Sequence, residues 1–137
     1  MGTMHRWVAI AVVVAGAPLL PATARADLHN ITYIARVDGV APGSTATFIT
    51  ADNQTNMAQL GALPGNSFQA NAVLPDPQHA GMQVAVKWPY SANVHCEIDV
   101  DDKVFVQVDQ VVHPAPGSND PMNGVLPCGA TLPNPAP

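Results

Sequence analysis

One stretch, residues 94–108, constrains the fold more than any other because its polar and apolar residues alternate. The apolar positions of its first half are Cys96, Ile98 and Val100, and the polar positions are His95, Glu97, Asp99 and Asp101. A period of two is the spacing of a β-strand with one buried and one solvated face. A polar run at residues 101–103 follows, and then a Val-rich segment. The stretch therefore predicts a β-hairpin whose first strand buries Cys96.

The N-terminus has the parts of an export signal. A short basic region at residues 5–6 precedes an apolar run over residues 7–20, and residues 24–26 give the small-x-small pattern of a cleavage site. The apolar run is too short, and too interrupted by proline, for a good membrane span. We therefore predict a signal peptide over residues 1–26, cut after Ala26, with cleavage after Ala24 as the alternative position. An uncleaved N-terminal anchor is the alternative.

The charge balance of the exported chain limits its partners. Residues 27–137 keep three basic residues against ten carboxylates, a net charge of −7 with histidine neutral. Nucleic acids and anionic lipid headgroups need clusters of Lys and Arg, so neither is expected as a partner. The length allows one domain with one modest core. The chain has two cysteines, and in a secreted or periplasmic envelope protein they predict one disulfide bond, Cys96–Cys128.

The remaining strand signals lie at short, regular spacing. Besides the hairpin, residues 30–37, 44–50, 67–74 and 82–88 carry strand-forming or alternating patterns, with turn residues between them. Residues 51–57 are polar and predict a loop. After the signal, helical periodicity of useful length is absent from the sequence. The pattern predicts an all-β fold, an immunoglobulin-like β-sandwich of about six to seven antiparallel strands over residues 27–128.

The composition changes at His113, after which proline recurs up to the C-terminus. Proline cannot donate to a β-ladder, so this segment predicts loop or tail. Its apolar residues gather at 125–128, and we expect the disulfide to tie them back to the sheet at Cys96. A closed loop of about 30 residues implies roughly 3–4 kcal/mol of stabilisation. After Cys128 we predict a disordered, Pro-rich tail over residues 129–137.

The carboxylates of the hairpin are candidate chemical groups. They are Glu97, Asp99, Asp101 and Asp102. Calcium needs six to eight converging oxygens, whereas side chains two apart on a flat strand diverge, so a solvated face is the better interpretation. A carboxylate pair for glycoside hydrolysis would need a cleft with stacking aromatics. Only Trp88 and Tyr90 are close enough in sequence to suggest one.

The histidines and the large apolar residues are also candidates. The histidines lack ligand spacing and are predicted to lie on the surface; they are His29, His79, His95 and His113. A bonded Cys96 excludes a Cys/His nucleophile with its neighbour. The large apolar residues either fill a core or line a lipid-sized cleft between the sheets, and core packing is the default in a small domain. The aromatic residues concerned are Tyr33, Phe48, Phe68 and Trp88.

The hairpin strand, followed about thirty residues later by Cys128, resembles the mycobacterial MmpS family. That family has a strand of the form Thr-Cys-x-Ile-x-Val-Asp-Gly-x-Val and a later second cysteine. The positions that match the strand are Cys96, Ile98, Val100 and Asp101. The resemblance covers residues 31–128. Asp102 stands where the family has the turn glycine, Gly65 stands where it has a tryptophan, and a cleavable signal replaces its membrane segment.

The resemblance implies an exported β-sandwich that assists RND-type transporters of lipids or siderophores. We therefore expect a non-enzymatic exported envelope protein whose partner is such a transporter or a lipid. We expect neither a catalytic residue nor a metal or other cofactor. The first alternative is a freely secreted interaction or antigen-like protein. The second is a hydrolase, for which the sequence offers neither a catalytic motif nor a convergent set of residues.

Overall fold

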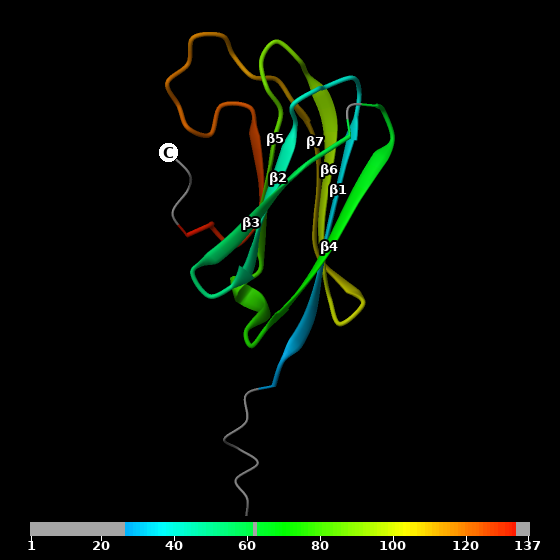
Figure 1. Cartoon of the computed structure of the whole chain (residues 1–137), viewed down its shortest axis with the longest axis vertical. Coiled ribbons are helices and arrows are strands. Elements are labelled where there is room, and N and C mark those ends of the chain that lie inside the picture. The colour runs from blue at the N-terminus through cyan, green and yellow to red at the C-terminus, as the bar shows by residue number, and fades with distance from the viewer. Residues whose placement is uncertain (1–26, 62, 134–137) are drawn as a thin grey trace, which may run out of the picture.

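The computed structural model of the protein describes residues 27–61 and 63–133, so the predicted signal at 1–26 lies outside the described residues (Figure 1). Within those ranges the chain forms eight β-strands and one short 3-10 helix. In chain order they are β1 (His29–Asp38), β2 (Thr45–Ala51), β3 (Gln54–Gln59), β4 (Asn66–Leu74), η2 (Pro77–His79), β5 (Gly81–Ala85), β6 (Ala92–Val100), β7 (Lys103–Val112) and β8 (Val125–Gly129).

The strands form two antiparallel sheets of four. One has the order β4-β1-β6-β7 and the other β3-β2-β5-β8. The sheets lie face to face as the two layers of a sandwich (Figure 1). The predicted all-β sandwich is therefore confirmed, with eight strands in the described part of the chain. In the part of the chain that the structure describes, no helix is long and apolar enough to cross a membrane.

Strand alternation decides which side chains fill the space between the sheets. The inward residues of β1 are all buried and are Ile31, Tyr33, Ala35 and Val37. Phe48 of β2 packs between two other rings, with centroid distances of 5.3 Å to Tyr33 and 5.7 Å to Phe68. The Tyr33 hydroxyl donates to the Ile49 carbonyl at 2.7 Å, so its one polar atom is satisfied inside the core. These three aromatic rings therefore pack in the core, as the default interpretation predicts.

The disulfide joins the two sheets. Cys96 lies on β6, in the interior of one sheet, and Cys128 lies on β8, at the edge of the other. Their Cα atoms are 6.3 Å apart, and 32 positions separate them along the chain. The predicted pairing is confirmed. In the chain-entropy model, a loop of this length corresponds to roughly 3–4 kcal/mol of stabilisation.

Two strands lie where the sequence predicted irregular structure. β3 covers most of the predicted loop at residues 51–57, and β8 lies inside the Pro-rich segment. β8 contains Pro127, which is tolerated because this strand pairs only with β5 and leaves its other edge free. β3 is also an edge strand and is almost wholly exposed, so its sequence lacks the alternation of a strand that covers a core.

The disordered tail predicted to start at residue 129 includes residues that the structure places against the sheets. Gly129 is the last residue of β8, the Ala130 N–H donates to the Ala80 carbonyl at 2.8 Å, and Leu132 is buried. A buried leucine and a paired backbone amide hold this segment against the sheets. The prediction is therefore wrong for its first residues, and residues 134–137 lie outside the described part of the chain.

The connections gather at the two ends of the sandwich because successive strands run in opposite directions. We call one end the loop end; its connections are residues 39–44, 60–65, 86–91 and 113–124. We call the other the turn end; its connections are residues 52–53, 75–80 and 101–102. The loop end is at the top of Figure 1, and the chain enters β1 from the turn end at the bottom.

Candidate functional site

The outer face of the β4-β1-β6-β7 sheet brings together polar residues from three strands. His95 of β6 lies opposite Arg36 of β1 on one side and opposite Asp109 of β7 on the other. Glu97 and Asp99 follow His95 on the same face of β6 at the two-residue spacing of a strand. We call these five residues the polar cluster. The sequence indicated only its β6 members, because cross-strand neighbours depend on the register.

His95 lies at the centre of the polar cluster and is only 7% exposed. Its Nδ1 is 2.8 Å from Oδ1 of Asp109, and its Nε2 is 3.0 Å from Oε1 of Glu97. Burial alone lowers the pKa of His95, but its bonds to the Asp109 and Glu97 carboxylates outweigh burial and raise the pKa above its usual value. With a carboxylate at each ring nitrogen, both N–H groups donate and the imidazolium is favoured. The prediction of a surface histidine is therefore wrong for His95.

Glu97 and Asp99 form a carboxyl pair beside this histidine. Burial, followed by the hydrogen bond and the negative charge of Glu97, raises the pKa of Asp99 to about 6. The hydrogen bond from Asp99 is the largest cause that lowers the pKa of Glu97, and His95 lowers it further. Oδ1 of Asp99 is buried without a hydrogen-bond partner among the described groups. Below about pH 6 the pair therefore holds one proton, which Asp99 carries, and at higher pH both carboxyls are ionised.

The geometry of the polar cluster favours a structural role over catalysis. Two carboxyls with divergent pKa values can serve as acid and base. Glycoside hydrolysis, however, needs the two carboxyls at least about 5 Å apart, whereas Glu97 and Asp99 share a hydrogen bond. His95 already engages a carboxylate at each ring nitrogen. The predicted solvated face is therefore a half-buried network whose members mostly satisfy one another.

The other predicted polar residues are distributed over both ends. Nδ1 of His29 is 2.7 Å from Oδ2 of Asp101, and this bond is the largest cause that lowers the pKa of Asp101. At the loop end, Nδ1 of His113 is 2.9 Å from Oγ of Ser91. Within residues 27–61 and 63–133, no group of three or more His, Cys, Asp or Glu side chains is placed to hold a metal ion.

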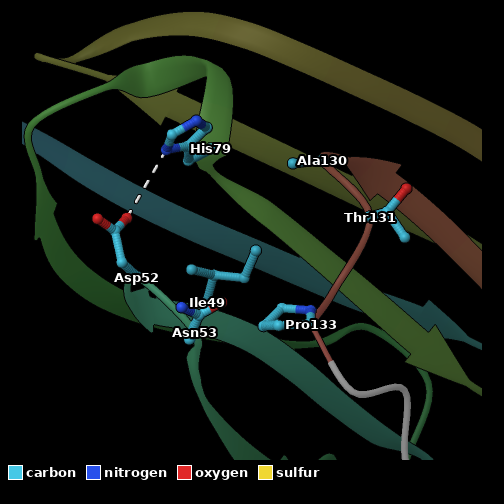
Figure 2. Close-up of a pocket in the computed structure, with 7 residues that line it drawn as sticks. All are labelled: Ile49, Asp52, Asn53, His79, Ala130, Thr131 and Pro133. Carbon is cyan, nitrogen blue, oxygen red and sulfur yellow. Dashed lines mark ion pairs between the residues drawn. The ribbon is translucent and has the colours of Figure 1, made fainter.

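A shallow pocket of about 340 Å³ lies at the turn end. Its lining residues are Ile49, Asp52, Asn53, His79, Ala130, Thr131 and Pro133. Figure 2 shows Asp52 and His79 directed toward each other on one side, and Thr131 and Pro133 on the other. Nδ1 of His79 is 3.7 Å from Oδ1 of Asp52, and both side chains are more than half exposed. Solvent screens such a pair, so the pocket offers exposed hydrogen-bonding groups.

Trp88 is not part of the core, and its predicted strand ends early. β5 stops at Ala85, and the Val86 N–H donates to the Gly124 carbonyl at 2.8 Å in the loop between β7 and β8. The chain thereby turns out of the sandwich, which leaves the Trp88 side chain 58% exposed. Tyr90, two residues later, is also exposed. The interpretation of Trp88 as a core residue is therefore wrong.

Comparison with known proteins gives no family assignment. The chain matches no protein-family model, and it matches no curated protein. The resemblance to the MmpS family therefore stays a prediction carried by the β6 strand with Cys96 and by Cys128 on β8.

Proposed function

We propose that this chain is an exported, non-enzymatic protein of the cell envelope that acts by binding, as an accessory to an RND-type exporter of lipids or siderophores. The observation that carries the proposal is the Cys96–Cys128 disulfide between the two sheets. Structural disulfides form and persist in oxidising compartments outside the cytosol. The same two cysteines carry the resemblance to the MmpS family, so one feature supports both the compartment and the partner class.

The polar cluster supports binding over catalysis. Among the described residues, His95 is bonded to Asp109 and Glu97, and Glu97 is bonded to Asp99, so most of the charged groups on this sheet face already engage one another. The pocket at the turn end has only a screened Asp52–His79 pair. Substrate conversion would need a convergent set of groups in such a hollow, and neither place provides one.

Fractionation and affinity purification test the proposal together. The full chain with a C-terminal tag is expressed in a mycobacterial host, and the tagged protein is measured in the envelope fraction and in the culture filtrate. We expect cell association, an intact mass lower by two hydrogens than after reduction, and enrichment of an RND-type transporter or an envelope lipid. The matched control is an unrelated exported domain with the same signal and tag.

The same envelope and filtrate fractions distinguish this proposal from the alternative of a freely secreted protein. Abundant free protein in the filtrate, with neither transporter nor lipid enriched over the control domain, would favour a freely secreted interaction protein. Recovery of the chain in the cytosol with both thiols reduced would contradict export itself.

A further inference from the structure

Charge is distributed unequally between the two ends of the sandwich. The carboxylates at the turn end and at the adjoining start of the described chain are Asp27, Asp52, Asp76, Asp101 and Asp102. The loop-end connections contain one carboxylate, Asp120, whose Oδ1 accepts the Met122 N–H at 2.9 Å. Asp38, where β1 reaches the loop end, is paired with Arg36 at 3.2 Å. In a chain with a large excess of acidic residues, the loop end therefore has few carboxylates.

The loop end also exposes large apolar side chains on every one of its connections. They are Val40, Leu63, Trp88, Tyr90 and Met122. Exposed apolar side chains occur at the turn end as well, but there Leu28 is next in sequence to Asp27 and Val104 lies two residues after Asp102. Of the two ends in the described part of the chain, the loop end is the one that combines apolar exposure with few carboxylates.

The connection between β5 and β6 carries Lys87, Trp88 and Tyr90, which are residue types that favour a lipid–water boundary. The Tyr90 N–H donates to the Lys87 carbonyl at 2.9 Å, which closes a turn that presents Trp88. The aliphatic stem of Lys87 lies over Gly43, where an added Cβ would be 3.2 Å from Cδ of the lysine. Trp and Tyr have an apolar body and a polar tip, and Lys can bury its stem while its ammonium group stays in water.

Hydrogen bonds between and within the loops at this end hold them in place, which limits the entropy cost of docking. The Val86 N–H donates to the Gly124 carbonyl at 2.8 Å, joining the connections before β6 and β8. The amide side chain of Asn123 accepts from the Ala115 N–H at 2.7 Å and donates to the Ala115 carbonyl at 2.9 Å. A surface that is ordered before binding loses less conformational freedom when it binds.

We propose that the loop end docks on the surface of a phospholipid bilayer, with Trp88 and Tyr90 at the headgroup boundary and the Lys87 ammonium at the lipid phosphates. This inference rests on the proposed export of the chain and names the lipid surface as a partner within that function. Trp88 and Tyr90 match a headgroup boundary because each has an apolar body and a polar tip. The Lys87 ammonium, at an end with few carboxylates, is complementary to the lipid phosphates.

The acidic turn end does not oppose this orientation. A strand of about ten residues spans roughly 30 Å, which is several times the Debye length of about 8 Å at physiological ionic strength. The carboxylates of the turn end are therefore screened from a surface that touches the loop end. Because burial of aromatic side chains supplies the affinity, binding to a zwitterionic surface should change little with salt.

Residues 27–137 provide a direct test because they contain both sheets and both cysteines. Trp88 is the only tryptophan in this segment, since the other of the two in the chain is Trp7. Its fluorescence therefore reports on the loop end alone. With phosphatidylcholine vesicles we expect a blue shift of the emission and flotation of the protein with the vesicles, at low and at high salt.

Matched variants locate the contact. Trp88→Ala should lower the vesicle partition coefficient, measured by flotation, by about tenfold or more, since burying a large side chain is worth well over one factor of ten. Phe105→Ala removes an exposed aromatic side chain at the start of β7, near the turn end, and should leave partitioning unchanged. Thermal melts of both variants check that the sandwich is intact.

Several outcomes would overturn the proposal. These are wild-type protein that neither shifts nor floats, an equal loss for Phe105→Ala, binding abolished by salt, or a dimer that buries Trp88 in the absence of lipid. If vesicle binding fails while the chain still purifies with a transporter, the docking inference is wrong and the proposed function stands. If vesicle binding succeeds but the chain stays in the cytosol, the proposed function fails.

Discussion

Replacing Asp99 by Asn should stabilise the protein at neutral pH and have little effect in acid. Asparagine has the shape of the protonated aspartic acid and can donate a hydrogen bond to Glu97, as the Asp99 proton does. In the wild type, raising the pH removes that proton from a partly buried carboxyl beside another negative charge. The variant never carries this charge, so it avoids the cost of deprotonation.

The magnitude follows from the pKa of Asp99, which rises from 3.8 to about 6 in the folded protein. Each pKa unit corresponds to about 1.4 kcal/mol, so the upper limit is about 3 kcal/mol. The carboxyl is partly exposed and shares its proton with Glu97, so we expect about 1–2 kcal/mol at pH 7. The folded state holds the proton more tightly than the unfolded chain between about pH 4 and pH 6. The free energy of unfolding of the wild type therefore falls, relative to the variant, as the pH rises through this window.

Urea denaturation of both proteins at a series of pH values measures the difference directly. We expect the two curves to coincide near pH 4 and to separate until about pH 6, with a constant difference above it. Asp52→Asn is the matched control, because it removes a carboxylate whose side chain is 65% exposed in a hairpin turn. A difference between Asp99→Asn and wild type that is independent of pH, or that favours the wild type at pH 7, would refute the reasoning.

Three further variants test the disulfide, a core hydrogen bond and a glycine at the end of β8. Cys96→Ala with Cys128→Ala should lower the free energy of unfolding by roughly 3–4 kcal/mol, and reduction should have no further effect on the melting temperature of this variant. Tyr33→Phe leaves the Ile49 carbonyl without its donor and should cost about 1–2 kcal/mol in urea denaturation, while a neutral result would show that water replaces the hydroxyl. Gly129→Ala forces a residue with a φ of +80° out of its preferred region, so we expect a loss of at least about 1 kcal/mol in thermal melts.

The alternating strands could be predicted from the sequence because one of their faces covers the core. On β6, Cys96 and Ile98 are fully buried and Val100 packs against the core, as the alternation indicated. The edge strands β3 and β8 gave no such signal. β3 is polar because little of it touches the core, and β8 contains a proline that only an unpaired strand edge accommodates.

The polar cluster could be predicted only in part. The sequence placed His95, Glu97 and Asp99 on one face of one strand, which is a local property. It did not show that Asp109 lies directly opposite His95, because this depends on the register of β6 with β7. Burial of His95 follows from these neighbours, so the pattern along the strand alone indicated a solvated face.

Trp88 shows a third limit of prediction from sequence. Its segment alternates like a strand as far as residue 88, and aromatic residues favour strands. The strand nevertheless stops at Ala85 because a carbonyl from a distant loop, that of Gly124, takes the next backbone N–H. A competing hydrogen-bond acceptor nearly forty residues away leaves no trace in the local pattern.

The position of the disulfide also determines how the domain would respond to mechanical force. β8 is the last strand, and its five residues pair only with β5, so its hydrogen bonds alone would resist little tension. Because Cys128 is covalently joined to Cys96, a pull on the C-terminal segment passes directly to β6, which has a hydrogen-bonded neighbour on each side. Tension applied from this end would therefore have to shear the interior of a four-stranded sheet, and peeling of the short edge strand would extend the chain by only a few residues.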